Sequence, residues 1–223
     1  MIKAILYKEW IKMRALLPVA AVAVLGFTVY ALLRVERAVD FRGAAHVWQI
    51  MIDKETVFIE PLRLLPALAG IATALVQFIP EMSPRRMKLT LHLPFPQRGM
   101  ILVMAAAGLG ALAVLFAAQA AMVWGYMHRL LAPELTARAM MTAVPWWAAG
   151  LTLYMLTAWI CLEPTWRRRV LYLLMTAGVA RMFFLSDVPR AYDGMLPWMA
   201  ALWLFSLLLP LLSVDRFKQG CQD

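Results

Sequence analysis

The chain is organised around the stretch IPEMSPRRMKLTLHLPFP, which occupies residues 79–96 between two long apolar segments. Ser83 followed by Pro84 is a favourable helix start, because the hydroxyl can accept from a free N–H and proline has no N–H to lose. The prolines that close the stretch prevent the helix from continuing. The sequence therefore predicts a short helix over residues 84–93 that carries Arg85, Arg86 and Lys88.

The composition on either side of this stretch is that of a membrane protein. The 223 residues are 63% hydrophobic and only 16% charged, whereas a soluble domain carries about a quarter charged residues. An apolar run of about 20 residues crosses a bilayer. We predict one all-α, polytopic membrane domain over residues 1–223, with six transmembrane helices at 15–33, 64–79, 100–126, 144–162, 170–185 and 195–214.

The first 14 residues predict a helix that lies in the membrane interface. Basic residues surround apolar residues that share one helical face, namely Ile2, Ile5, Leu6, Trp10 and Met13. Glu9 falls inside this apolar face. We expect Glu9 to reach water or pair with a nearby lysine, or alternatively to meet a basic partner such as Arg85 or Arg86.

Charge counting orients the chain in the membrane. Of the 22 lysines and arginines, 13 fall in segments assigned to the inside. Eight fall in the outer loops, predicted at 34–63, 127–143 and 186–194. Short loops rich in Lys and Arg remain in the cytoplasm, so both termini are expected there. The same bias accounts for the net charge of +9 and for Arg167–Arg169, and no nucleic-acid partner is expected.

The sequence contains no pattern for catalysis or for metal binding. His46, His92 and His128 fall in separate loops, and neither an HExxH nor a GxSxG motif is present. A GxxxxGK[ST] phosphate loop is also missing, so the chain cannot bind ATP in that way. Cys161 and Cys221 imply no disulfide. We expect a protein that is not an enzyme and has no cofactor of its own.

Arg181 is the ionisable residue that falls inside a predicted span. A charge within a membrane is a functional candidate, but Arg181 lies four residues from the outer end of its span, within the reach of a long side chain. Asp187 and Asp193 are candidate partners. Two interpretations remain open, structural anchoring and a place on a substrate path. Gln77 and Gln119 are expected to bridge helices.

Several of these features together resemble one family of transporters. They are the N-terminal helix with Lys8-Glu9-Trp10 and Arg14, the six spans, and the basic segment that ends in Leu91-His92-Leu93-Pro94. The family is the ABC-2-type permeases, the membrane subunits of ATP-binding-cassette exporters. Its loop after the second span places an acidic residue before basic and apolar residues and then Leu-Pro. The residues that fit this order are Glu81, Arg85, Arg86, Leu89, Leu93 and Pro94.

The resemblance implies a mechanism and a set of partners. The first segment would be the elbow helix, with Glu9, Trp10 and Arg14, and residues 84–93 would be the coupling helix. Two permease subunits, identical or different, would pair in the lipid of a bacterial inner membrane. Each would dock on a separate cytosolic ABC ATPase, which holds the ATP and Mg²⁺ and drives export. The docking residues implied are Glu81, Arg85, Arg86, Met87, Lys88, Leu89 and Leu91.

Two other functions compete with export. The chain could be a membrane assembly or immunity factor that binds partners within the bilayer, without transport. It could also be a membrane-embedded enzyme. This is the least expected function, because no predicted span has an Asp or Glu near its middle and the three histidines fall in separate loops. Nucleotide-dependent binding of a partner would distinguish a permease from an assembly factor.

Overall fold

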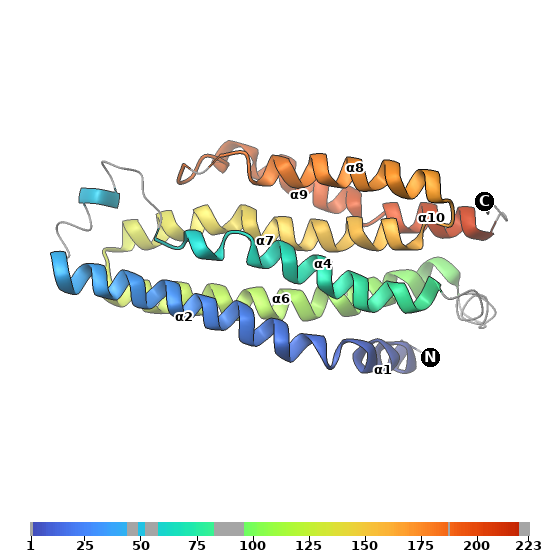
Figure 1. Ribbon diagram of the computed structural model, residues 1–223, viewed down its shortest axis with the longest axis horizontal. Coiled ribbons are helices and arrows are strands. Elements are labelled where there is room, and N and C mark those ends of the chain that lie inside the picture. Colours follow the sequence, from blue (N-terminus) through green and yellow to red (C-terminus); the bar gives the residue numbers. More distant parts are fainter. Residues whose placement is uncertain (1, 44–48, 52–57, 83–95, 187, 219–223) are drawn as a thin grey trace.

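The computed structural model describes residues 2–43, 49–51, 58–82, 96–186 and 188–218. Every regular element in these ranges is a helix, which confirms the all-α prediction. The helices of the bundle lie side by side along one axis (Figure 1). They are α2 (Leu16–Arg42), α4 (Leu65–Phe78), α6 (Gln97–Leu130), α7 (Pro133–Leu162), α8 (Trp166–Phe183), α9 (Leu196–Ser206) and α10 (Leu209–Lys218).

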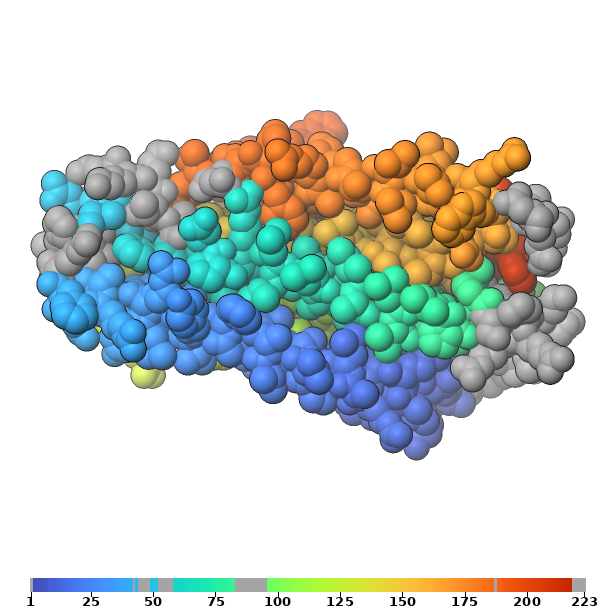
Figure 2. All heavy atoms as spheres, in the orientation of Figure 1, coloured from blue at the N-terminus to red at the C-terminus, as the bar shows by residue number. Residues whose placement is uncertain are grey.

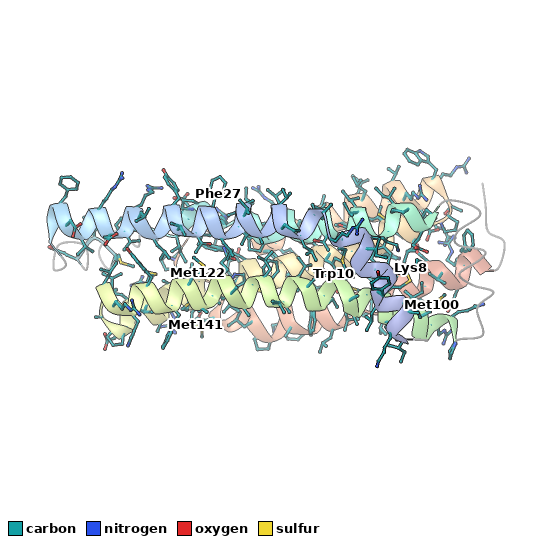
Figure 3. The ribbon with its side chains drawn as sticks, turned by 90° about the horizontal axis from the view of Figure 1, so that it is seen from below. Lys8, Trp10, Phe27, Met100, Met122 and Met141 are labelled. Atoms are coloured by element: carbon teal, nitrogen blue, oxygen red, sulfur yellow. The ribbon has the colours of Figure 1, made fainter. Side chains whose placement is uncertain are left out.

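The remaining elements join and cover the helices of this bundle. Helix α1 (Ile2–Met13) lies at an angle to α2, at the end of the bundle where α10 also ends (Figures 1 and 3). Among the described residues, short 3₁₀ segments lead into or out of the longer helices. They are η1 (Glu60–Leu62), η2 (Ile79–Met82) and η3 (Asp193–Met195). Of these, η2 directly follows α4 and precedes the segment at 83–95.

Within the part of the chain that the structure describes, five helical segments are long and apolar enough to cross a membrane, so the chain is a multi-pass membrane protein. They are Leu16–Phe41, Glu60–Met82, Gln97–Leu130, Pro133–Leu162 and Asp193–Phe217. Six spans were predicted. Helix α8, which covers most of the predicted span at 170–185, runs along the bundle beside the others (Figure 1). Its 18 residues are just long enough but include four arginines, so it does not meet the same requirement of composition.

The helices extend beyond the predicted spans at their charged ends. Helix α2 does not stop at Arg34 but continues until Gly43, whose φ of 79° takes the chain out of the helix while its N–H bonds to Val39 O. The outer loop predicted at 127–143 is wrong, because α6 and α7 are joined only by Leu131 and Ala132. Charged residues can continue a helix outside the hydrocarbon, so charge alone does not mark where a helix ends.

Helix α7 forms the centre of the bundle and packs closely on α4. In an apolar stretch of 18 residues within α7, 67% is buried inside the structure, whereas the value for the corresponding stretch of α2 is 22%. A Cβ atom on Gly70 of α4 would collide with the carbonyl oxygen of Gly150 on α7. A Cβ atom on Gly150 would lie 2.6 Å from Pro66 O and 2.8 Å from the Phe116 ring. Small residues let membrane helices approach in this way, and the two backbones are in contact.

A glutamine links three helices within the apolar part of the bundle. Gln119 of α6 donates to the hydroxyl of Thr28 on α2, with Nε2 and Oγ1 3.1 Å apart. Its Oε1 accepts from Trp147 Nε1 of α7 at 3.0 Å. Gln119 is 1% exposed, and both ends of its amide are bonded. The prediction that this glutamine bridges helices is confirmed.

The outside of the bundle is covered by large apolar side chains. In Figure 2, α4 lies between α2 and α8 on the visible face. The most exposed apolar residues of α2, α8 and α9 include Val19, Val22, Leu173, Leu174, Trp198 and Phe205. Contiguous apolar surface of this kind is rare in soluble monomers, and it is suited to contact with lipid chains.

Candidate functional site

Four charged side chains meet where α1 crosses the end of the bundle. Lys12 Nζ lies 2.7 Å from Glu9 Oε1 and 2.5 Å from Glu81 Oε1. Lys8 Nζ lies 2.8 Å from the same oxygen of Glu81. The side chains of Glu9 and Glu81 are 0% and 1% exposed. We call Lys8, Glu9, Lys12 and Glu81 the charged cluster, and it ties α1 to the end of the α4–η2 segment.

The inward face of α1 differs from the predicted apolar face. Ile5, Glu9 and Met13 are buried against the bundle, at the spacing of successive turns. The other predicted apolar residues, Ile2, Leu6 and Trp10, are at least 40% exposed, and Figure 3 shows Trp10 on α1. Glu9 therefore does not reach water.

Lys12 explains how Glu9 can be buried. A carboxylate without a partner is costly to bury, and Lys12 lies on the same helical face three residues later. The expectation that Glu9 pairs with a nearby lysine is confirmed. Its alternative partners, Arg85 and Arg86, lie outside the described residues.

A polar chain runs from the charged cluster into the core. Lys12 Nζ donates to Gln77 O at 3.4 Å. Gln77 Nε2 donates to Met104 O at 2.7 Å, and Gln77 Oε1 accepts from Tyr154 OH at 2.6 Å. A Cβ atom on Gly108 would lie only 2.5 Å from Gln77 Oε1. Gln77 thus bridges α4 to α6 and α7, as predicted, and it connects the charged cluster to the centre of the bundle.

The predicted docking residues are only partly visible. Arg85, Arg86, Met87, Lys88, Leu89 and Leu91, with the predicted helix over 84–93, lie outside the described residues. Glu81 is described, and its carboxylate is buried and bonded to Lys8 and Lys12 inside the protein. Its contact with an ATPase stays a prediction. Trp10 of α1 and Arg14, in the turn that follows α1, are both exposed.

Arg181 lies in the last turn of α8 on an exposed face. Asp193, one of its two expected partners, pairs with Arg190 instead, with 2.7 Å between Arg190 NH2 and Asp193 Oδ2. Asp187, the other expected partner, lies outside the described residues. Exposure on the outer surface of the bundle is the position expected for a side chain that reaches toward the membrane surface.

Sequence reasoning missed a second buried carboxylate, Glu163, at the end of α7. It is 0% exposed, and its Oε1 lies 2.8 Å from Arg216 NH1 of α10. The hydroxyls of Thr165 and Ser213 each donate to it at 2.7 Å. The available signal is a lone acidic residue beside an apolar span and before three arginines. A carboxylate at this position needs a positively charged partner when it is buried.

The charged cluster consists of ion pairs that hold α1 against the α4–η2 segment. Among the described residues, no group of three or more His, Cys, Asp or Glu side chains could hold a metal ion. Two ammonium groups stand against two carboxylates in the cluster, so its formal charges balance. The arrangement joins segments that are far apart in the chain.

None of the family models, curated proteins and solved structures with which the chain was compared matches it.

Proposed function

We propose that this chain is the membrane-spanning permease subunit of an ABC exporter. It would work as a dimer in a bacterial inner membrane, with each subunit docked on a separate cytosolic ATPase. The observation that carries the proposal is the place of Glu81. Glu81 lies two residues before Ser83, where the basic segment begins, and it is buried between Lys8 and Lys12 of α1. A force applied to residues 84–93 would therefore reach α1 and the core together.

In this proposal residues 84–93 are the coupling helix. Arg85, Arg86 and Lys88 would meet acidic groups on the ATPase, while Met87, Leu89 and Leu91 would fill an apolar cleft. Glu81 would act as the internal anchor of this helix. Closure of the ATPase dimer on ATP would then bias one of two arrangements of the packed helices, which is how ligand binding drives a conformational switch.

Helix α8 would be the sixth crossing in this proposal. Three of its arginines stand in its first turn and Arg181 stands in its last turn. Long arginine side chains can reach the two membrane surfaces from those positions, while Val170–Ala180 would lie in the apolar region. An even number of crossings would keep α1 and the end of α10 on one side, and they lie at the same end of the bundle (Figure 1).

The test is purification from the native membrane in mild detergent, followed by native mass spectrometry. We expect two copies of the chain with two copies of a soluble ATPase. Arg85→Glu combined with Arg86→Glu should release the ATPase and leave membrane insertion intact. Truncating one side of a desolvated charge pair costs about 2–5 kcal/mol, and reversing its charge should cost no less, which is enough for a clear loss.

The matched control reverses two other arginines, which are exposed at the start of α8. Arg167→Glu combined with Arg168→Glu changes the charge by the same amount, and both side chains are exposed. This variant should keep the ATPase. Retention of the ATPase by the Arg85/Arg86 variant would refute the docking assignment. A wild-type chain that purifies only with other membrane proteins would refute the permease assignment and favour an assembly factor.

A further inference from the structure

A groove of about 300 Å³ opens between α2 and α6, in the half of the bundle that lies away from α1. Its walls are apolar side chains from both helices, among them Leu32, Leu33 and Met122. Figure 3 shows Met122 on the side of α6 that faces α2. Gly125 lines the groove, and a Cβ atom there would meet nothing within 4 Å. The absence of a side chain at Gly125 therefore leaves space that an acyl chain can occupy.

One end of this groove is polar and basic, and a carboxylate of α2 is bonded to its lining. Tyr126 and Arg129 of α6 line it, and the Tyr126 hydroxyl donates to Glu36 Oε2 of α2 at 2.6 Å. Asp40 follows Glu36 by one helical turn, on the same side of α2. None of the ion pairs found among the described residues includes Arg129. Arg129 lines the groove, and Glu36 is connected to it through its bond with Tyr126.

The polar end lies at the level of lipid headgroups. Helix α6 has 34 residues, which corresponds to a length of about 51 Å. The hydrocarbon core of a bilayer is only about 30 Å thick. If α6 is centred on the bilayer, Arg129, next to its last residue, lies beyond the hydrocarbon, while Met122 and Leu33 lie deeper. Apolar walls below a charged rim match the two parts of a phospholipid.

We propose that this groove binds one phospholipid whose headgroup carries both a phosphate and a primary ammonium group, as in phosphatidylethanolamine. An acyl chain lies against the apolar walls. The phosphate accepts from the planar guanidinium of Arg129, which suits phosphate oxygens. The ammonium group donates to Glu36 or Asp40. A headgroup with phosphate but without ammonium would meet these carboxylates uncompensated, so phosphatidylglycerol should bind less well.

Two other grooves support this choice by contrast. One lies between α8 and α9 and is lined by residues such as Phe183 and Trp198, and the other runs along α2 beside Gly26. Neither lining contains a charged residue, so neither would select a headgroup. The inference concerns a lipid site on a single chain and does not depend on the proposed transport function.

The test uses the full chain in nanodiscs that contain equal amounts of phosphatidylethanolamine and phosphatidylglycerol with the same acyl chains. The protein is released into the mass spectrometer and the lipid that stays bound is identified. We expect phosphatidylethanolamine to be retained in preference by the wild type. Gly125→Leu fills the groove and should lower the bound fraction about tenfold, because several methylene contacts are lost. Gly110→Leu, on the same helix and also unobstructed, should retain the lipid.

A second variant tests the headgroup contact. Arg129→Gln removes the charge but leaves the apolar walls, and it should lower the bound fraction by up to about fivefold, as expected for an exposed charge pair. Equal retention by Gly125→Leu and Gly110→Leu would overturn the site. Retention of phosphatidylglycerol as well as or better than phosphatidylethanolamine would overturn the headgroup assignment.

Discussion

Replacing Lys12 by methionine removes the ammonium group that the two buried carboxylates of the charged cluster share. Lys12 is only 12% exposed, and its Nζ contacts both Glu9 and Glu81. After Lys12→Met, Glu81 keeps its contact with Lys8, but Glu9 loses the ion pair described for it. The other oxygen of Glu9, Oε2, is buried without a hydrogen-bond partner. An unpaired buried charge costs about 3–5 kcal/mol, and we expect the free energy of unfolding to fall by this amount.

Two further variants separate the charge effect from the loss of a lysine. Lys8 is 42% exposed, and Glu81 keeps Lys12 when Lys8 is changed. Lys8→Met should therefore cost no more than about 1 kcal/mol, as for other exposed pairs. Combining Lys12→Met with Glu9→Gln removes the unpaired charge together with its partner. Because contacting residues are coupled, the double variant should recover at least about 1 kcal/mol relative to Lys12→Met.

Unfolding in mixed micelles provides the assay. The fraction of denaturing detergent is raised, and helix content is followed by far-ultraviolet circular dichroism for the wild type and the three variants under identical conditions. The reasoning is refuted if Lys12→Met and Lys8→Met lower the free energy of unfolding equally. It is also refuted if the double variant is no more stable than Lys12→Met, because the burial of an unpaired Glu9 would then not be the cause.

Two other predictions concern packing and the second buried carboxylate. Gly150→Ala should lower stability by about 1–3 kcal/mol, because the new methyl group would lie 2.6 Å from Pro66 O. The control, Gly110→Ala, places its methyl group in open space and should be neutral or slightly stabilising. Equal thermal unfolding temperatures for the two variants would contradict the close contact of α4 and α7. Glu163→Gln leaves Arg216 without its ion pair and should cost about 3–5 kcal/mol, with faster hydrogen exchange in α10. Asp215→Asn, which breaks only the exposed pair with Arg98, should cost less than about 1 kcal/mol, and a larger loss there than in Glu163→Gln would argue against the buried pair.

Much of the fold could be predicted because apolar runs and proline positions are local signals. The spans at 64–79 and 144–162 lie within helical segments of the structure. The loop predicted at 127–143 failed for a physical reason. The residues at 127–143 are more polar than the spans, but α7 begins as early as Pro133, which suits the first turn of a helix. A charged residue outside the hydrocarbon can remain helical at little cost.

The candidate site was less predictable, because it depends on which helices pack together. The sequence indicated that Glu9 needed a partner, and a nearby lysine was among the options. It did not indicate that Glu81 would be buried beside that lysine. Glu163 carried no pattern that distinguished it from an ordinary loop residue, since its partner Arg216 belongs to a helix that follows two others in the chain.

The sequence by itself determined that this is an all-α membrane protein, because hydrophobicity and helical periodicity are sums over neighbouring residues. Tertiary structure alone decided how the charged cluster forms, since Lys12 and Glu81 are 69 positions apart and meet only when α1 packs beside the end of α4. It also decided the contact between Gly70 and Gly150. Such contacts depend on the relative placement of whole helices, and many placements would satisfy the same apolar pattern.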